Sequence, residues 1–420
     1  MDKMEGHVDL CRSCGGRRLE RFFDLGKHPC ANSFTDSRVE DEITYPLSLV
    51  RCPDCALIQL DHTVDPGKLF SKYVWVSGTS PTTIGYSKRF FDMVDERKRG
   101  LDPGYIFEAA SNDGTFLKPF LENGFKVLGM DPAANIVELA DQNGVRTECG
   151  FFGEDAARKV VEKYGEAGIV IARNVLPHVA NLTDFVKGLS IVVSDAGLLV
   201  VEFHYAGAIL EDLHYDSIYH EHLFYYTLKS AELLFNRYGL FVQDIERSPI
   251  NAGNIILFIR KGEASGNDIV CSYRNKEEVS GINELSVWKT FAVRADNHRK
   301  ELLAVLRRIR DDGNIIAGYG ASARSSTLLN FCGIGPELLT DIADKNVMKQ
   351  KKYTPGTHIR IVSPAELMEN DPDHVLILAW NFKDEIIDDL RKNYGYSGGF
   401  IVPLPSIDVV EGRCYAHGNS

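Results

Sequence analysis

Four consecutive residues near the middle of the chain combine the side chains that most often move protons. They are Tyr219, His220, Glu221 and His222. Imidazole titrates near neutral pH and a carboxylate can hold its tautomer, so the segment can supply a general base. A metal site is a weaker interpretation, because the H-E-x-x-H spacing is absent and the two histidines have no third ligand beside them. The alternative without chemistry is an aromatic loop that packs against a sheet.

Two cysteine pairs near the N-terminus have the spacing of a metal site. They are Cys11-Arg-Ser-Cys14 and Cys52-Pro-Asp-Cys55. A C-x-x-C turn points both sulfurs to one side, and two such turns can place four thiolates around one Zn²⁺ ion. Because four thiolates fill the coordination shell, we predict a structural zinc. A rubredoxin-like iron site and two redox-active pairs are the alternatives. The other cysteines have no partner at ligand spacing and are expected to be buried: Cys30, Cys149, Cys271, Cys332 and Cys414.

Acidic residues stand at the ends of two expected strands. The first strand ends at Glu108 and enters a turn with Asn112 and Asp113, and the second ends at Asp131. This is the plan of a nucleotide-binding βαβ unit, in which the last carboxylate accepts the ribose hydroxyls. Acidic groups in the turn would repel a pyrophosphate but suit the ammonium and sulfonium groups of S-adenosylmethionine (SAM). The alternative is that Glu108 and Asp113 only cap the helix.

Further polar residues follow other expected strands. Asn174 and His178 come after an apolar strand, and ligands of a doubly wound sheet bind beyond the carboxyl ends of its strands, so both are expected to face a cleft. Near the C-terminus, Gly318-x-Gly320-x-x-Ala323 and Asp344 predict a second βαβ unit. That glycine pattern is typical of dinucleotide binding, but alone it is a weak signal.

The elements that position these residues predict an α/β protein with two Rossmann-like, doubly wound domains preceded by a small zinc-binding domain. We expect a zinc-binding domain over 1–70 and a SAM-binding domain over 71–265. A helical linker over 266–312, made of one long helix or a helix pair, would lead to a second Rossmann-like domain over 313–420. Among the elements of the two sheets we expect a helix over 84–96 and strands over 168–172, 197–202, 254–260 and 338–343.

Composition excludes several classes of protein. The 420 residues are 44% hydrophobic and 25% charged, as in ordinary globular chains. The net charge of −12 makes nucleic acid an unlikely partner. No apolar run approaches the roughly 20 residues of a membrane span, and the N-terminus has no apolar segment of a secretion signal. We therefore expect a cytoplasmic protein without a membrane partner.

Taken in order, the motifs of the whole chain resemble the three-domain, SAM-dependent C-methyltransferases that act on nucleotide-linked 4-keto-deoxysugars. The motifs are the two cysteine pairs, Ala31-Asn-Ser-Phe34, Tyr73-x-Trp75-x-Ser77-Gly-Thr-Ser80, Ser111-Asn-Asp-Gly114, Ala172-Arg-Asn-Val175 with His178, Tyr219-His-Glu-His222, Gly318-Tyr-Gly-Ala-Ser-Ala-Arg324, Asn330-Phe-Cys-Gly-Ile334, Lys345 with Pro355-Gly-Thr-His358, and Ala379-Trp-Asn381.

The resemblance implies a role for many of these residues. The middle domain would hold SAM and the last domain would bind the sugar nucleotide. Catalytic residues would be Tyr219, Glu221, His222 and His178, with His222 or Tyr219 as the base that removes the proton next to the ketone. Glu221 would hold the tautomer of His222, and Arg324 would neutralise the diphosphate. The SAM contacts would be Glu108, Asn112, Asp113, Asp131 and Asn174, and the substrate contacts Tyr73, Trp75, Ser77, Gly320, Arg324 and Asn381.

One turn departs from the family pattern. Where the family has a His-Gly-Gly-Ser-like turn before an Arg-bearing strand, this chain reads Asn251-Ala-Gly-Asn254 after Pro249-Ile. Because the His and the Arg are absent, the sugar contacts that the family makes through them are not expected in the same form here. Epimerisation of a keto sugar, an NAD-dependent oxidoreductase and a non-catalytic binding protein remain alternatives. The sequence leaves open the sugar, the carbon methylated and the oligomeric state, a monomer included.

Overall fold

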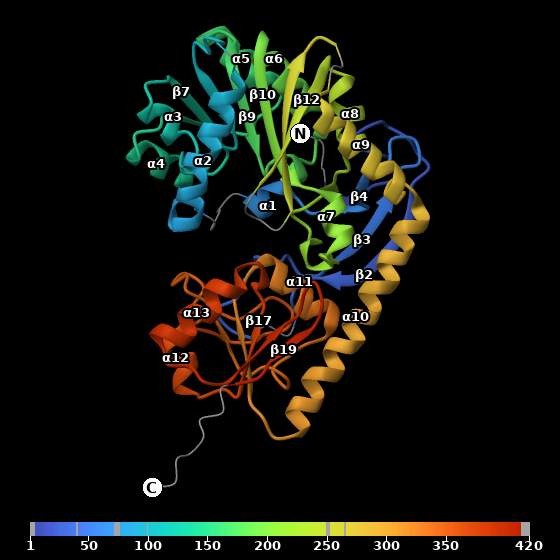
Figure 1. Ribbon diagram of the computed structural model, residues 1–420, viewed down its shortest axis with the longest axis vertical. Helices are drawn as coiled ribbons and strands as arrows, with labels where there is room; N and C mark the ends of the chain where they lie inside the picture. Colours follow the sequence, from blue (N-terminus) through green and yellow to red (C-terminus); the bar gives the residue numbers. More distant parts are fainter. Residues whose placement is uncertain are drawn as a thin grey trace. The chain divides into compact units, whose positions relative to one another are not determined.

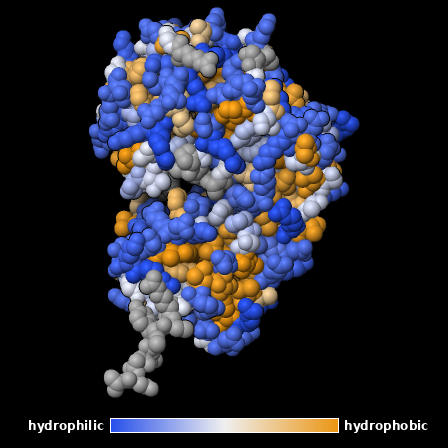
Figure 2. Space-filling view, viewed as in Figure 1, coloured by the Kyte–Doolittle hydropathy of each residue, from blue (hydrophilic) through white to orange (hydrophobic). Residues whose placement is uncertain are grey.

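The computed structural model describes residues 5–38, 41–70, 76–98, 100–248, 253–263 and 266–412. The chain forms two compact units (Figure 1). Unit 1 contains residues 1–21, 49–208 and 222–287, and unit 2 contains residues 22–48, 209–221 and 288–420. Hydrophilic residues cover most of the face shown in Figure 2. Of the helices in the described ranges, none combines the length and the apolar character needed to cross a membrane.

Unit 1 is built around a seven-stranded sheet with the order β12-β13-β10-β9-β6-β7-β8. Its strands are β6 (Ile106–Ala109), β7 (Val127–Asp131), β8 (Thr147–Cys149), β9 (Ala167–Arg173), β10 (Val193–His204), β12 (Leu240–Arg247) and β13 (Asn254–Lys261). Strands β6 to β10 are parallel, whereas β13 is antiparallel to both β10 and β12. Because β6 lies between β7 and β9, its carboxyl end is the switch point at which doubly wound sheets bind ligands.

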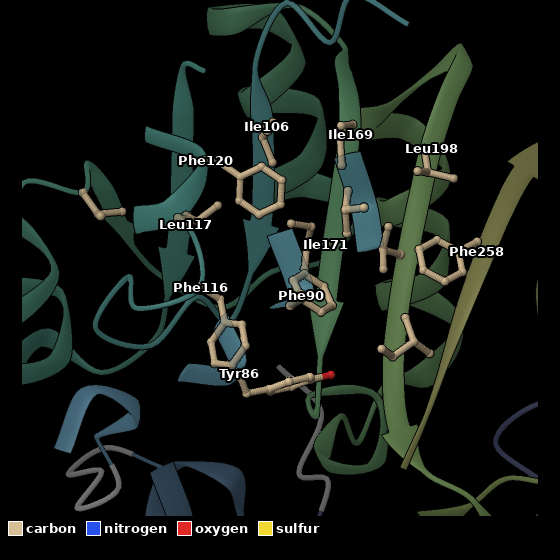
Figure 3. Close-up of a cluster of buried hydrophobic side chains, with 14 residues drawn as sticks. Tyr86, Phe90, Ile106, Phe116, Leu117, Phe120, Ile169, Ile171, Leu198 and Phe258 are labelled. Carbon is tan, nitrogen blue, oxygen red and sulfur yellow. The ribbon is translucent and has the colours of Figure 1, made fainter. Parts of the chain in front are cut away.

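Helices pack on both faces of this sheet (Figure 1). They are α2 (Pro81–Lys98), α3 (Lys118–Glu122), α4 (Ala134–Gln142), α5 (Glu154–Tyr164), α6 (Leu182–Val192), α8 (Leu228–Asn236) and α9 (Asp268–Ser280). Successive side chains of a strand point to opposite faces, so Ile106 and Phe107 of β6 enter different cores. Ile106 belongs to a buried cluster with Tyr86 and Phe90 of α2 (Figure 3). Phe107 instead contacts the ring of Phe152, with centroids 5.3 Å apart.

Short strands complete unit 1. β4 (Ile58–Leu60) pairs with β11 (Phe224–Tyr225) and with the end of β3 (Tyr45–Arg51). β1 (Gly6–His7) pairs with β5 (His62–Thr63). The short helices are α1 (Pro66–Phe70), the 3-10 helices Ser77–Thr79 and Leu176–His178, and α7 (Ala206–Glu211), which the unit boundary divides.

Unit 2 contains a six-stranded sheet with the order β16-β15-β14-β17-β18-β19. Its strands are β14 (Ile316–Tyr319), β15 (Ile342–Ala343), β16 (Ile361–Val362), β17 (His374–Ile377), β18 (Gly399–Val402) and β19 (Asp408–Val410). All are parallel except β19, which is antiparallel to β18. β14 lies between β15 and β17, so the strand order of this sheet also reverses at its first strand.

Within the described residues of unit 2, four helices and two 3-10 helices accompany this sheet. They are α10 (Leu285–Asp311), α11 (Ala323–Cys332), α12 (Pro364–Glu369), α13 (Lys383–Asn393), Tyr215–Ser217 and Trp380–Phe382. β2 (Glu20–His28) is the neighbour of β3 in the order β11-β4-β3-β2.

The predicted fold class, two Rossmann-like sheets with a small cysteine-containing region before them, is confirmed. Some elements differ from the sequence interpretation. The strand expected over 338–343 is limited to Ile342–Ala343, and the strand expected over 197–202 extends to Val193–His204. Two helices, α9 and α10, occupy the segment 266–312, which agrees with the helix pair that the sequence interpretation allowed.

Candidate functional site

Cys11, Cys14, Cys52 and Cys55 come together in unit 1. The sulfurs of Cys11 and Cys55 are 3.5 Å apart, as are those of Cys14 and Cys52. All four sulfurs lie within 4.8 Å of one another. Ligands at about 2.3 Å from a tetrahedral Zn²⁺ ion are about 3.8 Å from each other, so the cluster fits zinc.

The two cysteine turns are built alike. The backbone N–H of Gly15 donates to the carbonyl of Cys11 at 2.8 Å, and that of Ala56 donates to the carbonyl of Cys52 at 2.9 Å. Gly15 and Ala56 both have left-handed backbone, with φ of 76° and 58°. Each turn depends only on residues next to one another in the chain, which is why the spacing alone predicts the site.

The expectation of burial for the remaining cysteines is wrong for two of them. Cys149 and Cys271 are exposed, whereas Cys332 is buried and Cys30 is half-buried. Cys414 lies outside the described residues.

Glu108 is a buried carboxyl group at the carboxyl end of β6. It is 2% exposed, and its Oε2 has no hydrogen-bond donor within the described ranges. Burial raises the pKa of Glu108 to about 8; Arg173 lowers this pKa, and the carboxylates of Asp113 and Asp131 raise it further. A buried acceptor that lacks a donor suits a ligand with a positive charge.

Asp131, the last residue of β7, holds the turn that follows β6. Its Oδ2 accepts the backbone N–H of Asn112 and its Oδ1 accepts that of Ala133, both at 3.0 Å. Burial raises the pKa of Asp131, whereas these two hydrogen bonds lower it. A carboxylate has about four acceptor positions, so Asp131 can also accept the hydroxyls of a ribose.

Asp113 and Ser77, predicted to contact different ligands, lie at the same turn. The backbone N–H of Ser77 donates to Oδ1 of Asn112 at 3.0 Å, and that of Gly78 donates to Oδ2 of Asp113 at 2.9 Å. Oδ1 of Asp113 accepts the hydroxyl of Thr115 at 2.7 Å. Asp113 therefore organises the turn with both oxygens, and a ligand contact by it or by Ser77 remains a prediction.

A network of polar side chains lies where β9 and β10 end and β13 begins. Glu202 is fully buried, and its Oε2 accepts Nε–H of Arg173 at 2.9 Å. Asn254 donates through Nδ2 to Oδ1 of Asn174 at 2.8 Å and to Oε1 of Glu202 at 3.2 Å. The sequence analysis assigned a role only to Asn174. The signal for Glu202 was a charged residue within an apolar strand; Asn254 gave none, because its contacts depend on the register of β13 against β10.

His178 and His222 lie together in unit 1. Their ring centroids are 4.8 Å apart at an interplanar angle of 65°, and both side chains are half-buried. His178 ends the 3-10 helix that follows β9. The backbone N–H of Leu223 donates to the carbonyl of Pro177 at 2.7 Å, which ties the residue after His222 to this helix. Two predicted catalytic imidazoles thus meet at the carboxyl edge of the sheet.

Glu221 and Tyr219 belong to unit 2. Both oxygens of Glu221 accept hydrogen bonds from Nδ2 of Asn32, at 2.8 and 3.0 Å. Burial raises the pKa of Glu221 to about 7, and the hydrogen bonds from Asn32 lower it. Tyr219 is half-buried. Sequence reasoning missed the role of Asn32 as a partner of Glu221. The motif Ala31-Asn-Ser-Phe34 was recognised, but no local pattern linked it to Glu221.

The turn with Gly318 and Gly320 in unit 2 is filled by contacts with other residues of this unit. A Cβ atom on Gly320, whose φ is 99°, would lie 2.5 Å from Cβ of Ala379. Oδ2 of Asp344, the acid that closes the expected second βαβ unit, accepts the backbone N–H of Ala321 at 2.9 Å and lies 3.5 Å from Nζ of Lys349. These contacts disfavour the dinucleotide interpretation, and a substrate contact by Gly320 remains a prediction.

Arg324 has a carboxylate partner in unit 2. It donates from Nε and Nη2 to the two oxygens of Asp216, at 3.0 and 2.8 Å. Nε1 of Trp380 donates to Oδ2 of the same carboxylate at 2.8 Å. The contact of Arg324 with a diphosphate remains a prediction. Asn381, the residue after Trp380, is half-buried.

Some predicted residues lie outside the described ranges. They are Tyr73 and Trp75 of the expected substrate contacts, and Asn251 and Ala252 of the altered turn. The contacts expected of Tyr73 and Trp75 therefore remain predictions.

Three family models match consecutive parts of the chain. A zinc-binding domain matches residues 11–70, a methyltransferase domain matches residues 87–245, and a C-methyltransferase C-terminal domain matches residues 249–405. C-methyltransferase NovU of Streptomyces niveus is 31% identical over 407 residues, which cover 96% of this chain and 97% of NovU.

Among solved structures, magnesium protoporphyrin IX methyltransferase of Synechocystis PCC 6803 is 14% identical, over 43% of this chain and 79% of that one, with a TM-score of 0.32. The CcbJ methyltransferase of Streptomyces caelestis is 13% identical, over 45% of this chain and 94% of that one, with a TM-score of 0.34. Similarities this distant do not bear on the function.

The zinc cluster and the two doubly wound sheets thus belong to a methyltransferase with a zinc-binding region. The chain is a member of the C-methyltransferase family. The predicted class, a SAM-dependent methyltransferase with a structural zinc site, is confirmed.

Proposed function

We propose that this enzyme transfers the methyl group of SAM to the carbon next to the ketone of a nucleotide-linked 4-keto-deoxysugar. The observation that carries the proposal is the pair of imidazoles, His178 and His222, at the sheet edge that also bears Glu108 and Asp131. Membership of the C-methyltransferase family supports methylation at carbon. The order of motifs along the chain supports a sugar nucleotide as the acceptor.

Three residues of unit 1 would hold the methyl donor. Asp131 would accept the ribose hydroxyls, Asn174 would contact the donor, and Glu108 would face positive charge with Oε2, which has no hydrogen-bond donor in the described ranges. When bound, SAM supplies a methyl group on a positively charged sulfur, which a carbanion can accept.

The protein's own task is to make that carbanion. A proton on carbon next to a ketone is weakly acidic, and a base can remove it if a donor stabilises the enolate oxygen that develops. We assign His222 as the base that takes this proton on a ring nitrogen, with Tyr219 as the alternative base. His178 or Tyr219 would donate a hydrogen bond to the enolate oxygen.

Replacement of the base tests this assignment. We expect His222→Ala to lower turnover by at least roughly 100-fold, because a general base is typically worth 10² to 10⁴ in rate. Binding of S-adenosylhomocysteine, measured by calorimetry, should stay unchanged. His7→Ala, an exposed histidine of the same unit, is the matched control and should keep full turnover. Turnover of His222→Ala close to wild type would remove His222 from this role.

Mass spectrometry of the products tests the reaction itself. Reactions with SAM and a panel of nucleotide-linked 4-keto-6-deoxysugars, run in H₂O and D₂O, should yield a sugar heavier by one methyl group together with S-adenosylhomocysteine. Deuterium uptake without methylation would contradict C-methylation and favour epimerisation. Tight binding of NAD(H) in a fluorescence titration, with no methylated product, would favour the oxidoreductase.

A further inference from the structure

We propose that Arg173, Glu202 and Asn254 act as a relay of hydrogen bonds that fixes the orientation of the Asn174 amide. In this orientation Asn174 presents N–H donors, not its carbonyl oxygen, to an oxygen of the bound methyl donor. The inference rests on the proposed function and adds the chemical type of one ligand contact. It also assigns positioning roles to Arg173, Glu202 and Asn254.

The relay begins at Glu202, which forms a buried ion pair. Glu202 is fully buried, and the register of the sheet places it between Arg173 of β9 and Ile256 of β13. Its ion pair with Nε of Arg173 measures 2.9 Å. The guanidinium of Arg173 lies over the ring of Phe116, 3.1 Å from the centroid, and 5.1 Å from that of Phe90. Both rings belong to the cluster in Figure 3. Both oxygens of Glu202 thus accept, Oε2 from Arg173 and Oε1 from Asn254.

The acceptor character of Glu202 decides how the Asn254 amide is turned. The oxygen and nitrogen of an amide are told apart by their hydrogen-bond partners. Since Oε1 of Glu202 lies 3.2 Å from the Asn254 side chain, the group that faces it must be the NH₂. The same NH₂ donates to Asn174 at 2.8 Å. Oδ1 of Asn254 is left buried and without a donor in the described part of the chain, although a ligand or a solvent molecule could supply one.

The orientation of Asn254 decides in turn how Asn174 is placed. Because Asn254 offers its NH₂, the atom of Asn174 that receives it is Oδ1, and the NH₂ of Asn174 points away from Asn254. The backbone of Asn174 is also held, since its N–H donates to the carbonyl of Glu202 at 2.7 Å. Its φ is 51°, a left-handed conformation that asparagine tolerates better than most residues.

The donors of Asn174 select a ligand atom that accepts. Asn174 is half-buried and follows β9 at the carboxyl edge of the sheet, so a ligand at this edge can reach it. The methyl donor offers a carboxylate and ribose oxygens, and both kinds of atom accept hydrogen bonds. An acceptor at position 174 would instead face these oxygens with lone pairs and repel them.

Asn174→Asp tests the direction of the hydrogen bond. Asp at this position can still accept the NH₂ of Asn254 but presents an oxygen where the NH₂ stood. We expect S-adenosylhomocysteine to bind about 10- to 100-fold more weakly, the effect of one lost hydrogen bond with an unpaired buried acceptor. Asn236→Asp makes the same change at an exposed position of α8 and should alter the affinity by no more than about twofold. Calorimetry measures both.

Asn254→Leu tests whether Asn254 acts through Asn174. Leu has a similar shape but no NH₂, so Asn174 loses its orientation and affinity should fall. In the double variant N174D/N254L the affinity should be no lower than in N174D, because the relay then has nothing left to orient. Thermal unfolding checks that each variant folds, and N174D alone decides the direction of the bond if N254L does not.

Two results would overturn the relay while sparing the methyl donor: wild-type affinity in N174D, or fully additive losses in the double variant. Failure of the wild-type protein to bind S-adenosylhomocysteine would instead contradict the proposed function.

Discussion

At the scale of single residues, Glu108 should make the binding of a positively charged ligand depend on pH. Its carboxyl group is buried and one of its oxygens lacks a donor in the described part of the chain. Burial raises the pKa of Glu108 to about 8, so at pH 7 the ligand-free group holds its proton. A cationic ligand favours the carboxylate, and binding below about pH 8 must therefore release a proton.

Calorimetry in buffers of different ionisation enthalpy measures this release. At pH 7 the wild-type protein should release a proton when it binds SAM, and its affinity should increase with pH up to about 8 and then level off. Glu108→Gln cannot ionise, so its affinity should not depend on pH in this range. If proton release were equal in the two proteins, Glu108 would not face the cationic part of the ligand.

Residues differ in how far the sequence predicts their position. The four zinc ligands could be predicted because each turn needs only four consecutive residues. Glu108 and Asp131 could be placed because both stand at strand ends. The contact between Asn254 and Asn174 could not, because it spans 80 positions and depends on which residue of β13 faces which residue of β10.

At the scale of elements, α11 and the 3-10 helix Trp380–Phe382 hold the segment 214–221, which carries Tyr219 and Glu221. Asp216 in this segment is 1% exposed and accepts hydrogen bonds from Arg324 and from Nε1 of Trp380. Thr327 of α11 donates its hydroxyl to the carbonyl of Ile218 at 2.8 Å. The position of the two predicted catalytic residues therefore depends on a buried ion pair.

Removal of Arg324 should reveal how strongly this segment is held. Arg324→Met leaves a buried carboxylate without its cation and should destabilise the protein by about 3 to 5 kcal/mol. Arg158→Met breaks an exposed pair with Glu154 on α5 and should cost far less, because solvent screens that pair. Urea unfolding compares the two. A loss as small as that of the control, together with weaker binding of the sugar nucleotide, would mean that Arg324 serves the diphosphate instead.

Elements that follow a regular period were easier to predict than those that interrupt it. The helix expected over 84–96 is present as Pro81–Lys98, because its apolar residues Tyr86, Phe90 and Val94 recur every four positions and are buried. β12 was not predicted. Its pairing with β13 shifts between Val242 and Asp244, and this irregularity breaks the alternation of apolar and polar residues on which a strand prediction rests.

At the scale of the whole molecule, the two sheets have similar strand orders. The turns after their first strands differ in which polar atoms remain available to a ligand. In unit 1, Glu108 keeps an oxygen that finds no donor in the described ranges. In unit 2, Lys349 lies 3.5 Å from the carboxylate of Asp344 and also donates to the carbonyl of Ala321 at 2.7 Å. Ser322 and Ser325 satisfy each other's backbone N–H at the start of α11. A second nucleotide site would have to displace these contacts.

We therefore expect each chain to bind one molecule of S-adenosylhomocysteine, in unit 1, and no NAD(H). Equilibrium titration gives the stoichiometry, and a matched pair of variants assigns the site. Asp131→Asn weakens the acceptor of the ribose hydroxyls and should lower the affinity by about 10-fold or more. Asp344→Asn makes the same change in the other sheet and should leave the affinity unchanged, because the ammonium group of Lys349 lies beside this carboxylate and a ribose would have to displace it. Two molecules bound per chain, or an affinity that depends on Asp344, would show that the second sheet kept a nucleotide site of its own.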